Sequence, residues 1–260
     1  MHEAFNSEPS LQIDGFVATI MLRRPQKFNR LTTEDLLVLQ SQCRDIAQDK
    51  NVRAVVITAD TTGQKRPVFC AGYDMSGFEC PDHDPRLFEK TVECLSQLPQ
   101  VVIAVVNGSV LGGATDLVLA CDLRLGLEEA EFRMPACALG LHYYPGGLQR
   151  YVDVLGLSVA KQAFLLASPL SFERLRELGA FISLHPLDLI HAKGHELAQH
   201  IAHLAPLAIR TTKASLNEIS KRVSDTDVLM SRESQCLASS DFSEGRQAYA
   251  EKRRPQFTGK

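Results

Sequence analysis

Residues 107–122 read NGSVLGGATDLVLACD and decide how the middle of the chain is expected to fold. They follow Val101–Val106, a β-branched run that suits a buried strand. After Gly112 and Gly113 the apolar residues recur at helical spacing, so a helix is expected to begin there. Backbone N–H groups at the start of a helix favour negative charge, and glycine lets a ligand approach them closely.

A second turn of small residues points to the same chemistry. Residues 69–74 read FCAGYD, and the backbone from Ala71 to Tyr73 would direct another N–H group toward the same oxygen atom. Two converging N–H groups stabilise an oxyanion, which predicts a carbonyl substrate that becomes an enolate or a tetrahedral anion. The alternative is that both segments are only tight turns in a packed α/β core.

The whole chain has the composition of an ordinary globular protein. Its 260 residues suffice for one large α/β domain, and 45% of them are hydrophobic. The net charge of -3 gives no electrostatic reason to expect binding to nucleic acid or to a membrane. No apolar run reaches ~18 residues, no signal peptide is visible, and the seven cysteines are scattered. These features predict a reduced, cytoplasmic protein.

The order of expected elements indicates an α/β core that is followed by helices. A hairpin is expected over Leu11–Leu22, a capped amphipathic helix over Thr32–Lys50, and strands over Val52–Thr58 and Leu123–Leu127. Further helices are expected over residues 87–98, 158–167, 171–178, 187–204, 208–223, 226–239 and 244–253. Strands that alternate with helices, before a wholly helical run, favour a mostly parallel sheet with a helical C-terminal part.

Several segments occur in the order that one enzyme family shows. They read LRRPQKFNRL, FCAGYDM, AVVNGSVLGGATDLVLACDLRL, FRMP, LGLHYYPGGLQR and SSDFSEGRQAYAEKRRPQF. Together they resemble the crotonase (enoyl-CoA hydratase/isomerase) superfamily over nearly the whole chain. The resemblance implies an α/β spiral of ββα units in residues 1–200 and a helical region in residues 201–260 that oligomerises and covers the active site. It also implies an acyl-CoA substrate, no separate cofactor, and a homotrimer or a hexamer made of two trimers.

The resemblance also assigns residues to the binding of the thioester and of CoA. The thioester oxygen would lie between two backbone N–H groups, which by motif belong to Tyr73 and Gly113. Residues expected to contact the CoA moiety are Gln26, Lys27, Phe28, Ala71, Asp74 and Met75. Lys252 and Arg253 either meet the CoA phosphates across a subunit interface or form a solvated basic tail.

The acid–base residues depart from the family pattern. Hydratases of this family use two glutamates that position a water molecule and exchange protons. The first matches Asp116, which keeps the carboxylate but is one methylene shorter; the second matches Ala136, which cannot titrate. Asp116 is either catalytic or a helix N-terminal residue that serves the helix dipole. The alanine at position 136 therefore argues against simple two-carboxylate hydration.

The loop LGLHYYPGG offers other groups for the chemistry. In decarboxylase-like and hydrolase-like crotonases a histidine or a tyrosine near this loop takes part, and Tyr143 aligns with such a tyrosine. His142 would act as a general base near neutral pH. The alternative is that the rings only shape the pocket wall. Three functions follow: an enoyl-CoA hydratase/isomerase-like enzyme, a decarboxylase or hydrolase that uses His142 or Tyr143, and a non-catalytic acyl-CoA-binding protein.

Two groups of possible metal ligands are not expected to bind metal. The segment HAKGHELAQHIAH contains His191, His195, His200 and His203. His195 and His200 are five residues apart, ~140° around a helix, so they do not form a two-histidine metal site. Cys80, His83 and Cys94 would suit zinc, but their segment more resembles a variable loop over an acyl pocket.

Overall fold

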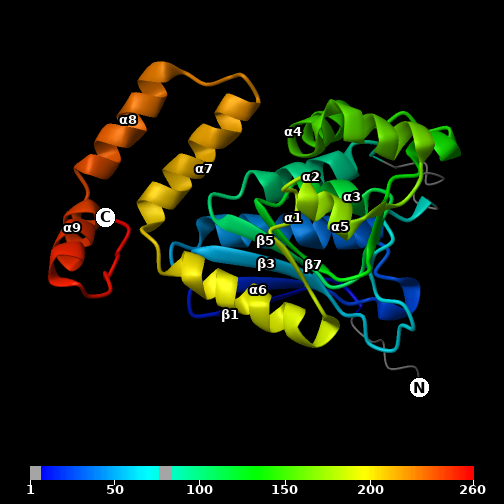
Figure 1. Ribbon diagram of the computed structural model, residues 1–260, viewed down its shortest axis with the longest axis horizontal. Helices are drawn as coiled ribbons and strands as arrows, with labels where there is room; N and C mark the ends of the chain where they lie inside the picture. The colour runs from blue at the N-terminus through cyan, green and yellow to red at the C-terminus, as the bar shows by residue number, and fades with distance from the viewer. Residues whose placement is uncertain (1–6, 76–83) are drawn as a thin grey trace.

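The fold consists of two β-sheets with helices on their outer faces and a helical arm at the C-terminus (Figure 1). The computed structural model describes residues 7–75 and 84–260. Within them the larger sheet has the strand order β1-β2-β3-β5-β7-β10 and the smaller sheet the order β4-β6-β8-β9. The strands are Ser10–Asp14 (β1), Val17–Leu22 (β2), Ala54–Ala59 (β3), Val68–Cys70 (β4), Val101–Val106 (β5), Ser109–Leu111 (β6), Leu123–Leu127 (β7), Glu131–Arg133 (β8), Leu170–Ser171 (β9) and Ser183–His185 (β10).

From β3 to β8, successive strands alternate between the two sheets, and each pair of strands is followed by a helix. β3, β5 and β7 lie in the larger sheet, and β4, β6 and β8 follow them in the smaller one. The neighbours β3–β5, β5–β7, β4–β6 and β6–β8 are parallel. This repeat confirms the predicted α/β class with ββα units. The helices are Thr33–Gln48 (α1), Leu87–Ser96 (α2), Ala114–Leu119 (α3), Pro145–Lys161 (α4), Phe172–Glu177 (α5), Leu187–Ala202 (α6), Pro206–Ser220 (α7), Thr226–Leu237 (α8) and Ser240–Glu251 (α9).

The core lies on both faces of the larger sheet. All six residues of β3 are buried, as expected for a parallel strand that is covered on both sides. Figure 1 shows α6 below this sheet and α1, α2 and α3 above it. The helix α6 approaches so closely that a Cβ atom on Gly194 would lie 2.3 Å from a methyl group of Val105.

Gly108, in the connection from β5 in the larger sheet to β6 in the smaller sheet, is expected to contribute to stability. A Cβ atom on Gly108 would lie 2.6 Å from the backbone nitrogen of Phe69, which cannot move aside as a side chain can. Gly108→Ala is therefore expected to lower the free energy of unfolding by roughly 1–3 kcal/mol. The matched control is Gly245→Ala on α9, where the nearest atom lies 3.6 Å away. Urea unfolding measures both variants, and equal stability would contradict the expectation.

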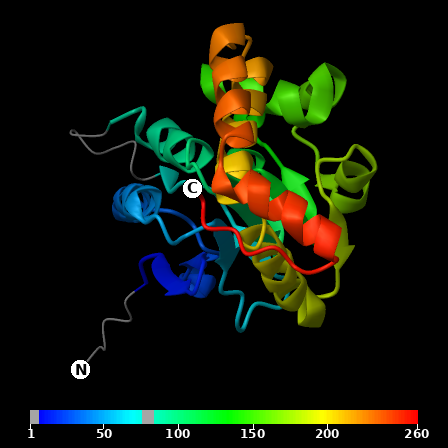
Figure 2. The ribbon, with the colours of Figure 1, turned by 90° about the vertical axis from the view of Figure 1, so that its left-hand side faces the viewer.

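The helices α7, α8 and α9 form an arm that extends away from the sheets (Figures 1 and 2). None of the residues of α8 is buried. The chain then returns toward the core, where the Arg53 guanidinium donates hydrogen bonds to the carbonyl oxygens of Ala202 and Phe257 at 3.1 and 3.0 Å. The segment that follows α9 therefore contacts the end of the sheet at which β3 begins.

The helix predicted over residues 158–167 is only the second part of a longer one. The helix α4 begins at Pro145, bends at Gly156 (φ 75°, ψ 155°) and continues as a π-helical turn over Gln162–Leu166. Glycines near its start and at the bend interrupt the helical pattern, because glycine disfavours a helix interior. Pro145 in the first turn is the sequence signal that marks the true start.

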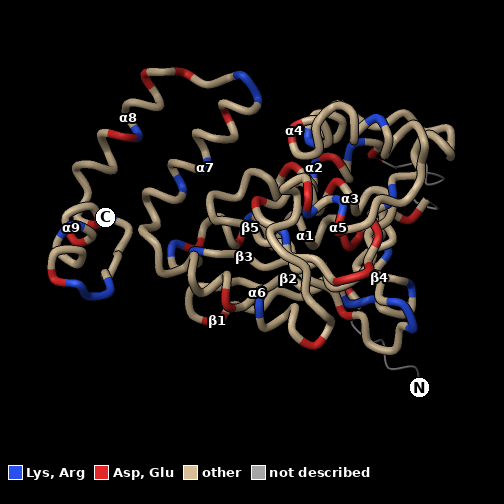
Figure 3. Tube along the Cα trace, viewed as in Figure 1, with Lys and Arg blue, Asp and Glu red and all other residues tan. Residues whose placement is uncertain are grey.

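The surface of the described chain is mixed in charge. Figure 3 shows basic and acidic residues interspersed along the trace. Within the described residues, no helix combines the length and the apolar character needed to cross a membrane.

Candidate active site

The two glycine turns predicted from the sequence meet in the structure. Gly72 has a φ of 93°, and a Cβ atom placed on it would lie 3.0 Å from the Gly113 nitrogen and 3.0 Å from the Leu111 oxygen. A Cβ atom on Gly112 would lie 3.5 Å from the Ala71 oxygen. Only a residue without a side chain fits at Gly72, because its φ and this close contact both exclude one. The backbones around Gly72 and Gly113 are therefore direct neighbours.

Backbone hydrogen bonds hold the turn that contains Tyr73. The Leu31 N–H donates to the Gly72 oxygen at 2.9 Å, and the Asp74 N–H donates to the Leu31 oxygen at 2.8 Å. Gly113 lies at the start of α3, and its own N–H donates to no group in the described part of the chain. The N–H of Gly113 is thus available to a ligand next to a turn whose peptides are fixed.

Most residues expected to contact CoA lie together beside these turns. Gln26 and Lys27 are exposed in a 3-10 turn, and the Ala71 N–H donates to the Phe28 oxygen at 2.9 Å. Met75 is exposed, and Asp74 forms an ion pair with Arg30 at 3.1 Å. These residues form one surface along the two segments.

Lys252 lies elsewhere in this chain. It ends α9 with a φ of 54° and is exposed, while its neighbour Arg253 pairs with Glu244 at 2.6 Å. Figure 1 shows α9 at the far end of the arm, on the opposite side of the molecule from α3 and α4. A single chain therefore does not bring Lys252 to the other residues that were expected to contact CoA.

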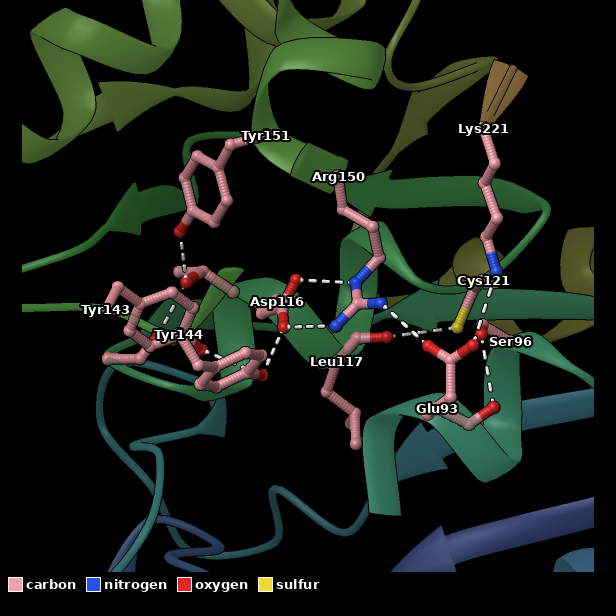
Figure 4. Close-up of polar contacts among 12 residues, drawn as sticks. Glu93, Ser96, Asp116, Leu117, Cys121, Tyr143, Tyr144, Arg150, Tyr151 and Lys221 are labelled. Atoms are coloured by element: carbon pink, nitrogen blue, oxygen red, sulfur yellow. Dashed lines mark hydrogen bonds and ion pairs between the residues drawn. The ribbon is translucent and has the colours of Figure 1, made fainter. Parts of the chain in front are cut away.

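Asp116 is fully buried and held by three donors (Figure 4). Arg150 donates to both carboxylate oxygens, from Nε to Oδ1 and from an Nη to Oδ2, at 2.8 Å each. The hydroxyl of Tyr144 also donates to Oδ2. A carboxylate offers about four acceptor positions, so one position on Oδ1 remains. The Asp116 N–H donates to the Gly113 oxygen at 3.0 Å, which places this carboxylate one helical turn from the paired turns.

The ion pair continues through Glu93 to the helical arm. The guanidinium of Arg150 also contacts a Glu93 oxygen at 3.2 Å, and the Lys221 ammonium contacts the other oxygen at 3.2 Å. Burial alone would lower the pKa of Arg150, but hydrogen bonds to Asp116 and the charges of Asp116 and Glu93 raise it well above its usual range. Burial would raise the pKa of Glu93, but a hydrogen bond from Gln97 and the charge of Lys221 lower it.

Tyrosine rings cover one side of Asp116. Tyr143 and Tyr144 stack with their centroids 4.3 Å apart, and the Tyr143 hydroxyl donates to the Tyr144 hydroxyl at 3.2 Å. Burial, and then the negative charge of Asp116, raise the pKa of both phenols far above the usual range. They therefore remain neutral hydrogen-bonding groups near pH 7 and do not act as phenolate bases.

The other expected acid–base positions do not join this cluster. His142 is exposed, although its sequence neighbours Tyr143 and Tyr144 face inward. Ala136 is buried with 2% of its surface exposed, and it adds no titratable group. The structure thus brings Asp116 and Tyr143 together, with Tyr144 between them.

One cavity of the described chain lies away from Gly113. A cavity of about 700 Å³ lies between α7, α4 and the far end of α3, with Leu119, Val154 and Leu216 in its wall. Arg150 also lines it, so this residue separates the cavity from Asp116.

Possible metal ligands are dispersed. The described residues contain no cluster of three or more His, Cys, Asp or Glu side chains that could hold a metal ion. The histidines at positions 191, 195, 200 and 203 are all exposed. Cys80 and His83 lie outside the described residues, and Cys94 is a half-buried free thiol.

Neither Arg150 nor Glu93 was predicted from the sequence to belong to the site. The sequence did hold one signal for such a partner. An aspartate within the apolar segment ATDLVLA is expected to be buried, and a buried carboxylate requires a partner of opposite charge. The start of α4 at Pro145 would then have placed Arg150 in the second turn of that helix.

Comparison with known proteins agrees with the geometry. Residues 12–260 match the protein-family model described as enoyl-CoA hydratase/isomerase. The YngF protein of Bacillus subtilis is 34% identical over 251 residues, which cover 94% of this chain and 95% of that protein. The short-chain-enoyl-CoA hydratase of Clostridium acetobutylicum is 29% identical over 252 residues, which cover 94% of this chain and 95% of the relative. A crystal structure of an enoyl-CoA hydratase from Bacillus anthracis is 31% identical and superimposes with a TM-score of 0.87 over 97% of this chain and 100% of that one.

Proposed function

Because the chain belongs to the enoyl-CoA hydratase/isomerase family of the crotonase superfamily, we propose that it is an enzyme that forms an enolate from an acyl-CoA thioester. The observation that carries the proposal is the meeting of the turns at Gly72 and Gly113. In the proposed complex the N–H groups of Tyr73 and Gly113 donate to the thioester oxygen. One such donor is worth roughly 3–4 kcal/mol of transition-state stabilisation.

Asp116 is the proposed acid–base group. It lies one helical turn from Gly113, and one acceptor position on Oδ1 is left by Arg150 and Tyr144. A single carboxylate can take a proton from the carbon next to the thioester and return it two carbons further along. Hydration needs a second group to activate water, and Ala136 does not provide one. Isomerisation of an enoyl-CoA is therefore the favoured reaction.

Decarboxylation is the second candidate. The hydrogen bonds that link Tyr143, Tyr144 and Asp116 favour it. Tyr143 donates to Tyr144, and Tyr144 to Asp116, so these side chains are engaged with one another. Loss of carbon dioxide from a malonyl-type acyl group needs no base, because the electrons of the broken C–C bond pass directly into the enolate. A neutral tyrosine then serves to orient the substrate. The exposed position of His142 favours Tyr143 for this role.

A panel of CoA esters and a pair of Asp116 variants test the proposal. Purified protein is incubated with enoyl-CoA and malonyl-type CoA esters, and products are identified by mass spectrometry. Asp116→Asn is expected to reduce isomerisation at least ~100-fold, because general acid–base catalysis typically contributes that much. Asp116→Glu keeps a carboxylate and is expected to retain more activity.

The outcomes separate the candidates. Full activity of Asp116→Asn would remove Asp116 from the mechanism, and turnover of malonyl-type esters alone would identify a decarboxylase. Binding of CoA esters without any product would instead identify a non-catalytic binding protein. A melting curve of each variant distinguishes lost chemistry from lost folding.

The helical arm is the proposed oligomerisation surface. Its exposed apolar side chains include Leu216, Ile219, Val223, Val228 and Met230. In a trimer, or in a hexamer made of two trimers, this surface would be covered, and Lys252 would reach the CoA of a neighbouring subunit. Light scattering of the purified protein measures the assembly, and a monomer at all concentrations would contradict this part of the proposal.

A further inference from the structure

The side-chain direction of Gly113 is occupied by an aromatic ring. A Cβ atom on Gly113 would lie 2.8 Å from Cζ of Phe88 and 3.0 Å from its Cε1. The nitrogen and the Cβ position share the same Cα atom, so the tip of the ring lies within ~5 Å of the Gly113 nitrogen. A group that receives a hydrogen bond from this N–H therefore lies close to the Phe88 ring.

Two further rings hold Phe88 in place. The ring centroids of Tyr73 and Tyr144 lie 6.1 and 6.5 Å from that of Phe88, both tilted by 53°. The hydroxyls of both tyrosines are held by hydrogen bonds. The Tyr73 hydroxyl lies 3.0 Å from the Thr33 hydroxyl, and the Tyr144 hydroxyl donates to the Asp116 carboxylate. Phe88 and the two tyrosine rings that flank it form a wall beside Gly113, which we call the aromatic wall.

The helix that carries Phe88 is itself anchored in the core. Thr91 on α2 is buried. Its hydroxyl accepts a hydrogen bond from the Gln40 amide on α1 at 2.9 Å and donates one to the Leu87 oxygen at 2.9 Å. Leu87, Val92 and Leu95 on the same helix are buried in the hydrophobic core. The backbone of α2 therefore fixes where the Phe88 ring begins.

We propose that Phe88 limits the acyl group of the substrate to a short chain. The inference rests on the proposed function, because it takes the Gly113 N–H as the donor to the thioester oxygen. The first carbons of the acyl group then lie against the aromatic wall, and the ring fills the space that further methylenes would need. Phe88 is thus a specificity-determining residue.

Calorimetry with non-reacting saturated CoA esters tests the proposal. Free CoA, acetyl-CoA, butyryl-CoA and octanoyl-CoA are titrated into the wild-type protein and into Phe88→Ala. Each newly buried methylene adds roughly fourfold to affinity, so Phe88→Ala is expected to bind octanoyl-CoA at least ~10-fold more tightly than the wild type does. Its affinity for acetyl-CoA is expected to change less than ~3-fold, because a two-carbon chain does not reach the new space.

Two further variants make the measurement specific. Phe16→Ala removes the same ring from the β1–β2 turn, where it stacks on Arg53 at 4.1 Å, and is expected to leave the chain-length profile unchanged. Phe88→Leu keeps an apolar side chain if Phe88→Ala fails to fold, and is expected to shift the profile in the same direction by a smaller factor.

The results distinguish failure of this inference from failure of the proposed function. If no ester binds more tightly than free CoA, the proposed function is overturned, and the role of Phe88 with it. If the esters bind but the wild-type protein binds octanoyl-CoA as tightly as butyryl-CoA, the inference alone is overturned. The same holds if both Phe88 variants leave the ratio of the two affinities unchanged.

Discussion

Replacing Arg150 with methionine is expected to lower the free energy of unfolding by about 3–5 kcal/mol, the typical cost of leaving a buried charge without its partner. The carboxylate of Asp116 has no exposed surface and would keep only the Tyr144 hydroxyl as a donor. Methionine fills a similar volume, so the change removes the charge and the hydrogen bonds more than the packing. Urea unfolding at a fixed protein concentration measures the loss.

Two comparisons make this prediction specific. The double variant Asp116→Asn with Arg150→Met removes both charges and is expected to recover much of the lost stability. Arg232→Met breaks a similar two-fold contact with Glu218, at 2.8 and 2.6 Å, but on the partly exposed surface of the arm. Solvent already screens that pair, so its loss is expected to change stability little. A small effect of Arg150→Met, equal to that of Arg232→Met, would contradict the interpretation of Asp116 as a buried ion-paired group.

Gly72→Ala is expected to reduce kcat/KM at least ~100-fold, the usual effect of losing one oxyanion donor. The added methyl group would lie 3.0 Å from the Gly113 nitrogen, and alanine also disfavours a φ of 93°. Both effects push the two turns apart and misplace their N–H groups. Steady-state kinetics with the ester identified by the substrate panel measures the change.

The control for Gly72→Ala is the same substitution at another glycine that has a positive φ. Gly63 has a φ of 77° and nothing within 4 Å of an added Cβ atom, so Gly63→Ala carries the backbone strain without the contact. It is expected to keep normal activity with a small loss of stability. If Gly72→Ala folds and is as active as Gly63→Ala, the two turns do not form the oxyanion site.

The sequence predicted well those elements that carry a clear local signal. The strand Leu123–Leu127 has the expected bounds, and Thr32 caps the predicted helix through a reciprocal pair of hydrogen bonds with Asp35. The strands of the smaller sheet were not predicted, because three residues such as Val68–Cys70 or Ser109–Leu111 carry too little periodicity. Their pairing depends on tertiary contacts and not on local preference.

The candidate site was only partly predictable for a related reason. The two glycine turns are local features, so their chemistry could be inferred from a few adjacent residues. The partner of Asp116 is 34 residues away on another helix, and the orientation of Tyr144 toward it depends on how α4 packs. The contact of Phe88 with Gly113 likewise arises only when α2 and α3 lie side by side.

Glu93 divides its carboxylate between Arg150 and Lys221, and this sharing joins the arm to the candidate site. Asp116, Arg150, Glu93 and Lys221 come from four different helical segments and together are electroneutral. A second bond, from the Ser220 hydroxyl to Asp153 at 3.1 Å, holds the end of α7 against α4. If α7 moved away, the three charges left behind would carry a net negative charge around a buried carboxylate. The docking of the arm thus sets the electrostatic balance at Asp116, although no residue of the arm touches it.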